Sequence, residues 1–180
     1  MENIKLSEAN KKYKYADILE GCEEAIEKNM KPPSGVYYRL VHDPLHPNDD
    51  LPQPLQQWDA LTEGKTELSH QLPKDSSIED QWKHVKAYSP SYNESDEKLA
   101  AYFLKEYDRR RTIKQKEKFL NKKGDTIVAV KLTPNDGLIS DIEENGHCVF
   151  LPFEGFKLED HIDESWESQK LMNYRNEENE

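Results

Sequence analysis

Two histidines and three aspartates gather in the segment that follows a short apolar run, GVYYRLVHDPLHPNDDLP at residues 35–52. A His-x3-His spacing is typical of a zinc site when both rings lie on one face of a helix. Pro44 and Pro47 do not allow a helix here, and in an extended chain the two rings would lie ~13 Å apart. A turn would bring them together, but the spacing favours an exposed polar loop, so we expect no metal site. The five residues are His42, Asp43, His46, Asp49 and Asp50.

Arg39 stands inside the aromatic run before those histidines. A guanidinium group is costly to bury without a partner. Arg39 therefore either faces solvent, paired with a surface acid, or meets a carboxylate, a phosphate group or a partner molecule. Alternation along a strand puts Arg39 on one face with Tyr37 and Val41, and the pattern leaves open which face is the core.

His147 follows a glycine at the start of a late apolar run, and its position suits either an ordinary strand edge or a side chain that reaches into a cleft. Ser89 and Ser91 lie between a predicted strand and a predicted helix, but they lack the glycines of a G-x-S-x-G turn. The seven glycines are scattered, without a phosphate-binding loop or a dinucleotide fingerprint. We therefore expect no serine-type triad and no nucleotide binding through those motifs.

A second candidate site is the basic segment at residues 101–135, which carries ten Lys or Arg residues against four acids. Residues 151–180 have the opposite balance, with three basic and nine acidic residues. One interpretation is a solvated helix face and a solvated tail. The other is a binding face for an acidic partner or a phosphate group, centred on Arg109, Arg110, Arg111 and Lys114.

Two stretches, YYRLVHDPLHPNDDLP and GHCVFLPFEG, resemble a group of small uncharacterised bacterial proteins. That group pairs an early YRLV strand and a proline-rich loop with a late Gly-His-His-x-x-x-Pro strand, and this chain has Cys148 where the second histidine is expected. The resemblance covers most of the chain and supplies no reaction. It implies that Arg39 and His147 lie near each other.

A weaker resemblance is to ADP-ribosyltransferase folds, which use an early arginine or histidine, a middle serine or tyrosine and a late acid. Arg39 or His42, then Tyr88 or Ser89, then Glu154 match that order. The resemblance implies an NAD-using enzyme in which the arginine holds pyrophosphate, the tyrosine stacks on nicotinamide and the carboxylate stabilises an oxocarbenium-like centre. Its predicted catalytic set is Arg39, Tyr88, His147 and Glu154.

The elements that must position these residues follow from periodicity and breaker residues. They predict an α+β domain over residues 1–167, with a small mixed or antiparallel sheet against one long helix, an N-terminal helix, a proline-rich loop over 43–79 and a polar acidic tail over 168–180. The helices are expected at 7–30, 93–122 and 158–166, and the strands at 36–42, 82–88, 126–132, 138–142 and 147–151.

Composition narrows the classes of function. The net charge of −11 opposes nonspecific binding to nucleic acid or to an anionic membrane, and we find no apolar run long enough to span one. Cys22 and Cys148 lack metal-ligand spacing, and reduced thiols in a cytoplasmic protein are expected. Our leading hypothesis is a small intracellular binding protein with a protein partner and no cofactor, in a bacterial operon concerned with defence or toxin control. The alternative is the NAD-using enzyme.

Overall fold

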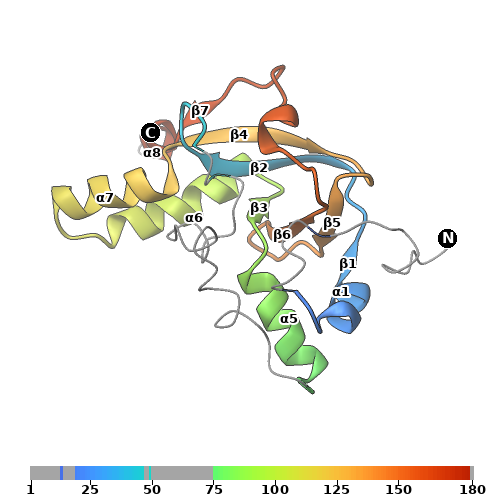
Figure 1. Cartoon of the computed structure of the whole chain (residues 1–180). Helices are drawn as coiled ribbons and strands as arrows, with labels where there is room; N and C mark the ends of the chain where they lie inside the picture. The colour runs from blue at the N-terminus through green and yellow to red at the C-terminus, as the bar shows by residue number, and fades with distance from the viewer. Residues whose placement is uncertain (1–12, 14–18, 47–48, 50–74, 179–180) are drawn as a thin grey trace.

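The computed structural model describes residues 13, 19–46, 49 and 75–178 of the 180-residue chain. The fold is α+β, and its strands form an antiparallel seven-stranded sheet in the order β1-β5-β6-β3-β2-β4-β7 (Figure 1). The strands are β1 (Met30–Lys31), β2 (Gly35–Val41), β3 (Ser91–Asn93), β4 (Thr126–Leu132), β5 (Gly137–Ser140), β6 (His147–Pro152) and β7 (Gln169–Lys170). The helices are α1 (Glu23–Asn29), α5 (Ile78–Ala87), α6 (Asp96–Asp108), α7 (Ile113–Lys123), the 3-10 turn η2 (Leu158–Asp160) and α8 (Leu171–Glu178).

The longest pairing in the sheet is β2·β4, which is in register over the full length of both strands. Its apolar, mostly β-branched β4 is buried on both faces, as the sequence TIVAVKL predicts. On one face, Leu40 and Ile127 pack against α6 and α8. On the other face, Tyr37 and Val130 pack in one buried cluster with Phe150 of β6, so strands of the same sheet pack against each other there.

The expected long helix over 93–122 is wrong, because the chain forms two helices that lie side by side (Figure 1). The second begins at a capping box in which the Thr112 hydroxyl accepts from the Gln115 backbone N–H at 3.1 Å. The Gln115 side chain in turn accepts from the Thr112 backbone N–H at 3.3 Å. A T-x-x-Q pattern of this kind starts a new helix. The expected helix also began too early, since residues 91–93 are strand β3.

The strand expected over 82–88 is also wrong, because this segment is the helix α5. The Ser77 hydroxyl accepts from the Asp80 backbone N–H at 3.1 Å, and two acids occupy the first turn. Gln81 and Val85, four residues apart, are its buried residues. The helical spacing of these contacts outweighs the strand propensity of Trp82 and Val85.

Both ends of the chain differ from expectation. Of the helix expected over 7–30, the structure shows α1 from Glu23, while residues 1–12 and 14–18 lie outside the described residues. The expected polar tail instead supplies β7, which pairs with β4, and α8. Leu171 is fully buried against α6, so this segment belongs to the core. The helix expected over 158–166 is reduced to η2, and most of the expected 43–79 loop lies outside the described residues.

Gly124 joins α7 to β4 and offers a direct test of how α7 is held against the sheet. Its φ is +96°, and a methyl group on its Cα would collide with the carbonyl of Val41 on β2. Gly124→Ala adds left-handed strain and an overpacked contact, so we expect a loss of about 2–5 kcal/mol in the free energy of unfolding. Gly155→Ala is the matched control, because φ is +93° there with open space around the Cα. It should lose only ~1–2 kcal/mol in urea unfolding, and equal losses would contradict the contact.

Candidate functional site

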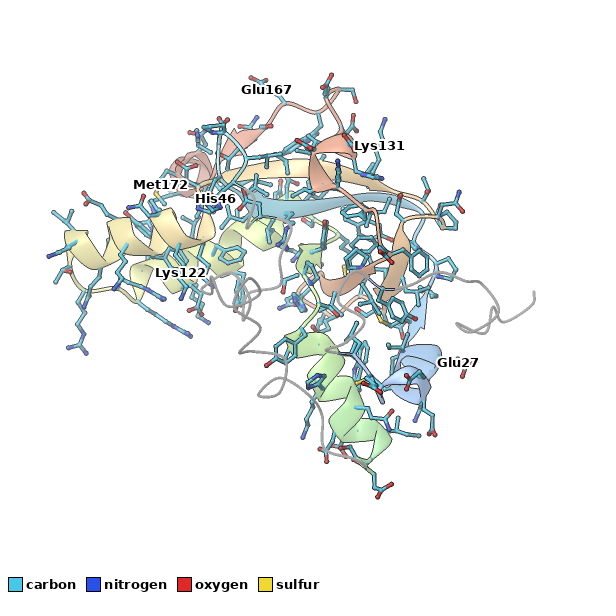
Figure 2. The ribbon with its side chains drawn as sticks, in the orientation of Figure 1. Glu27, His46, Lys122, Lys131, Glu167 and Met172 are labelled. Carbon is cyan, nitrogen blue, oxygen red and sulfur yellow. The ribbon has the colours of Figure 1, made fainter. Side chains whose placement is uncertain are left out.

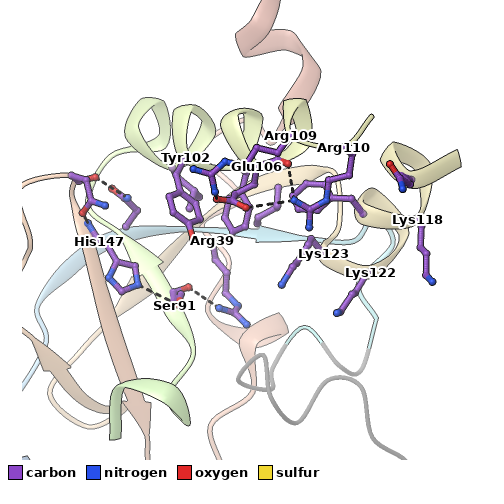
Figure 3. Close-up of a pocket in the computed structure, with 17 residues that line it drawn as sticks. Arg39, Ser91, Tyr102, Glu106, Arg109, Arg110, Lys118, Lys122, Lys123 and His147 are labelled. Carbon is purple, nitrogen blue, oxygen red and sulfur yellow. Dashed lines mark hydrogen bonds and ion pairs between the residues drawn. The ribbon is translucent and has the colours of Figure 1, made fainter. Parts of the chain in front are cut away.

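A pocket of about 770 Å³ opens where α6 and α7 meet the ends of β2 and β3 (Figure 3). Among the residues that the structure describes, its wall holds six cationic side chains and a single carboxylate, that of Glu106, although the whole chain carries a net charge of −11. Tyr102, Phe103 and Phe119 add aromatic surface. The six cations are Arg39, Arg109, Arg110, Lys118, Lys122 and Lys123.

Glu106 neutralises only part of this charge. Its carboxylate accepts from Arg109 Nη1 at 2.8 Å and lies 3.5 Å from Arg110 Nη1. Arg110 also stacks over the ring of Phe119, with 4.5 Å between its Cζ and the ring centroid. The lysines of α7 that line the pocket form no ion pair with a carboxylate in the part of the chain that the structure describes. Lys122 projects from the helix among them (Figure 2).

Lys123 shows the energetic consequence of this crowding. Burial disfavours its ammonium, the charges of Lys122 and Arg110 oppose it further, and Arg39 adds a smaller effect. Glu106 offsets this in part, and the result is a pKa lowered to about 8. The pocket therefore holds a half-buried cation at a position where an anion would stabilise it.

Arg39 is buried, with 6% of its surface exposed, and is not the outward arginine paired with a surface acid that one interpretation expected. Its Nε donates to the carbonyl of Asp49 at 2.9 Å, and its Nη1 donates to the carbonyl of Ser91 at 2.7 Å. Its guanidinium also lies 5.2 Å from the ring centroid of Tyr92. Carbonyl oxygens and an aromatic face thus compensate the buried charge.

Arg39 and His147 both line this pocket. Ser91 connects them: its carbonyl binds Arg39, and its hydroxyl lies 3.3 Å from His147 Nε2. The other ring nitrogen of His147 lies 2.6 Å from the carboxylate of Glu143. The lack of flanking glycines predicts no serine–histidine arrangement, yet the Ser91 hydroxyl and the His147 ring lie within hydrogen-bond distance. The missed signal is the antiparallel register of β3 and β6, which places Asn93 opposite His147.

The turn that carries Glu143 and His147 is fixed by Asn93, whose side chain is buried. The Asn93 amide donates to the carbonyl of Asn145 at 3.2 Å, and its carbonyl oxygen accepts from the Ser95 backbone N–H at 2.9 Å. Gly146 has φ of +83° and packs so tightly on Asn93 that a side chain there would collide with it. The packing of Gly146 on Asn93 therefore fixes the backbone of the turn before His147, while the side chains of Ser91 and Glu143 are exposed.

Other predicted site residues lie away from this pocket. Tyr88 is half-buried at the end of α5, with its ring centroid 4.7 Å from that of His84. Glu154 is exposed in the turn after β6. Arg111 and Lys114 are exposed and are not among the lining residues, whereas Arg109 and Arg110 line the pocket. The four-residue NAD site is thus not assembled around one cleft.

The histidine and aspartate cluster forms a local polar network. The carboxylate of Asp49 accepts from the His42 backbone N–H at 3.0 Å and the His46 backbone N–H at 2.9 Å, and lies 2.7 Å from His42 Nδ1. Burial opposes the charged ring of His42, but hydrogen bonds with Asn121 and Asp49 and the charge of Asp49 prevail and raise its pKa. Within the described ranges, no group of three or more acidic, histidine or cysteine side chains is arranged to hold a metal ion.

Both cysteines are buried and unpaired by disulfide. Burial, helped by nearby acids, raises the pKa of Cys148 to about 12 and that of Cys22 to about 11. A thiol must lose its proton to act as a nucleophile. These two side chains are therefore core residues.

Comparison with known proteins does not add to the site. No protein-family model matches the chain, and searches of curated proteins and of solved structures find no match. Across the helices that the structure describes, none combines the length and the apolar surface needed to cross a membrane.

The contribution of the two Arg39 hydrogen bonds to stability can be tested with a substitution that keeps the positive charge but removes the planar guanidinium group. A lysine ammonium cannot replace a guanidinium that reaches the carbonyls of both Ser91 and Asp49. We expect Arg39→Lys to lower the free energy of unfolding by about 2–4 kcal/mol, since each hydrogen bond from a charged donor contributes about 1.5–3 kcal/mol. Arg109→Lys, at an exposed arginine of the same pocket, should change it by less than ~0.5 kcal/mol. Similar denaturant midpoints for the two variants would show that the hydrogen bonds of Arg39 do not hold β2 to β3.

Proposed function

We propose that this protein binds a phosphate-bearing small molecule in the pocket between α6, α7 and the ends of β2 and β3. The observation that carries the proposal is the surplus of cations: within the described part of the chain, six cationic side chains line the pocket against one carboxylate. Lys123 is half-buried among them with a lowered pKa. A di- or triphosphate would supply the missing negative charge and would accept hydrogen bonds from several of these side chains at once.

The convergence of the cations favours a small molecule over an acidic protein surface. They come from β2, from the turn after α6 and from α7, and they face one cavity of about 770 Å³. Pockets of ~300–1,000 Å³ are typical of small-molecule sites. By contrast, Arg111 and Lys114 are exposed and do not line the pocket.

Aromatic groups favour a ligand that carries a planar ring. Tyr102 lines the pocket and is 52% exposed, so a large aromatic ring is accessible from solvent. Its ring stands nearly perpendicular to that of Phe103, with 5.1 Å between the centroids. A nucleobase stacked on such a ring gains about 1–3 kcal/mol. A nucleotide is therefore the ligand class that uses both the charge and the aromatic surface.

The proposal is tested by calorimetric titration with ADP, with adenosine as the uncharged comparison. The double variant Lys122→Ala/Lys123→Ala should weaken ADP binding by about 10–100-fold, because it removes charged donors worth about 1.5–3 kcal/mol. Lys114→Ala is the matched control, since Lys114 lies on α7 outside the pocket. It should change the affinity less than about twofold. Equal losses in the two variants, or equal affinity for ADP and adenosine, would refute a phosphate site in the pocket.

The affinity should also depend on pH through Lys123. Its pKa of about 8 in the free protein must rise when an anion binds, because the anion favours the charged form. Binding therefore takes up a proton above pH 8, and the affinity falls as the pH rises. Between pH 7.5 and 9.5, where the phosphates of ADP are already ionised, we expect a loss on the order of tenfold. Lys123→Arg should bind with a nearly flat profile, while Lys122→Arg should keep the slope. An unchanged slope in Lys123→Arg would show that another group titrates.

A further inference from the structure

Beside the cations, the pocket is lined by a serine and a histidine. The carboxylate of Glu143, which is not among the lining residues, lies behind the histidine and completes an order that activates a hydroxyl group. Ser91 Oγ lies 3.3 Å from His147 Nε2, and His147 Nδ1 lies 2.6 Å from a carboxylate oxygen of Glu143. Ser91 and His147 both line the pocket (Figure 3). Nucleophile, base and orienting group within this reach are what nucleophilic catalysis by serine requires.

The hydrogen bonds determine which nitrogen of the ring carries the proton. An ionised carboxylate only accepts, so the bond with Glu143 requires a proton on Nδ1 of His147. In the neutral ring Nε2 is then the acceptor, and it faces the hydroxyl of Ser91. The tautomer is thus the one in which His147 can take the serine proton.

The register of the strands keeps the two groups on one face. Because Asn93 pairs with His147 and Ser91 pairs with Val149, these four side chains share a face of the β3·β6 ladder. Tyr92, between the two β3 residues, points the other way into a core cluster. Asn93 is buried and binds the Asn145 carbonyl in the turn before His147. The arrangement is preorganised by backbone pairing.

We propose that Ser91 and His147, oriented by Glu143, hydrolyse a phosphate ester bound in this pocket. The inference rests on the proposed function, because the same cations would hold the substrate phosphate. A phosphate ester is the favoured class because cationic side chains around a transferring phosphoryl group stabilise its developing charge. The guanidinium of Arg39 donates to the backbone carbonyl of Ser91 at 2.7 Å, so one cation is fixed to the residue that carries the nucleophile.

The reaction would proceed in two steps. In the first, Ser91 Oγ transfers its proton to His147 Nε2 and forms a bond to phosphorus, the bond from phosphorus to the ester oxygen breaks, and that oxygen takes the proton from His147. In the second, His147 accepts a proton from water, the hydroxide oxygen bonds to phosphorus, the serine–phosphorus bond breaks, and Ser91 regains the proton. The sum is ester plus water giving an alcohol and phosphate, without an oxidant or reductant.

The test measures hydrolysis of p-nitrophenyl phosphate by the full chain, with p-nitrophenyl acetate as the uncharged ester. Ser91→Ala and His147→Gln should each reduce kcat by about 10²–10⁴-fold, the contribution expected of a general base and its nucleophile. Glu143→Gln should lower kcat about tenfold with KM unchanged, and should move the lower limb of the pH–rate profile, which loss of a purely structural contact would not do. Peptide mapping after an acid quench should find the phosphoryl group on Ser91.

His161→Gln is the matched control. His161 Nε2 lies 2.8 Å from the carboxylate of Asp136, and this pair lies outside the pocket. This variant should keep full activity.

Binding of ADP separates the two proposals. Ser91→Ala should bind ADP as the unaltered protein does, which also shows that it folds. ADP binding without turnover of p-nitrophenyl phosphate would overturn the relay and leave the proposed function intact. Turnover that survives in Ser91→Ala would overturn the serine as nucleophile, and hydrolysis of the acetate alone would overturn the phosphate ester as substrate. Loss of ADP binding in the unaltered protein would refute the proposed function, and the relay with it.

Discussion

The buried guanidinium of Arg39 holds together the two parts of the sheet. Strands β2 and β3 share a single backbone pair, Tyr38 with Asn93, which is a short junction for a seven-stranded sheet. Arg39 lengthens this junction, because its side chain binds the Ser91 carbonyl where the ladder ends. A buried charge in this position is stable only when oxygen atoms surround it. The carbonyls of Ser91 and Asp49 meet that requirement.

The same junction creates the pocket. Since the two strands separate beyond their one pair, the space between them is covered by α6 and α7 instead of by a neighbouring strand. Gly124 allows α7 to end against the backbone of β2, and this contact brings Lys122 and Lys123 toward Arg39. Although the protein is acidic, its cationic side chains are concentrated in this pocket, where the repulsion between them favours a bound anion.

The sequence predicted the strands that are defined by their own apolar residues. The strand over 126–132 and the run that contains Arg39 are where their apolar composition placed them. The sequence pattern missed the helix α5 and the separate start of α7, where the polar capping residues Ser77 and Thr112 outweigh the apolar pattern. The basic residues of α7 were visible in the sequence as a charged segment. The sequence did not show that these residues converge with Arg39, because the convergence depends on pairing between strands that are more than fifty residues apart in the chain.

The position of the nucleophile shows why register matters more than residue type. Cys148 directly follows His147 and is the more intrinsically reactive group, but successive side chains of a strand point to opposite faces. It therefore enters the core with Phe150, and burial raises the pKa of its thiol to about 12. Ser91 is more than fifty residues away in the chain, yet antiparallel pairing brings its hydroxyl to within 3.3 Å of the ring. In this fold the partner of His147 is thus selected by strand pairing, and a search confined to neighbouring residues would choose the thiol that cannot react.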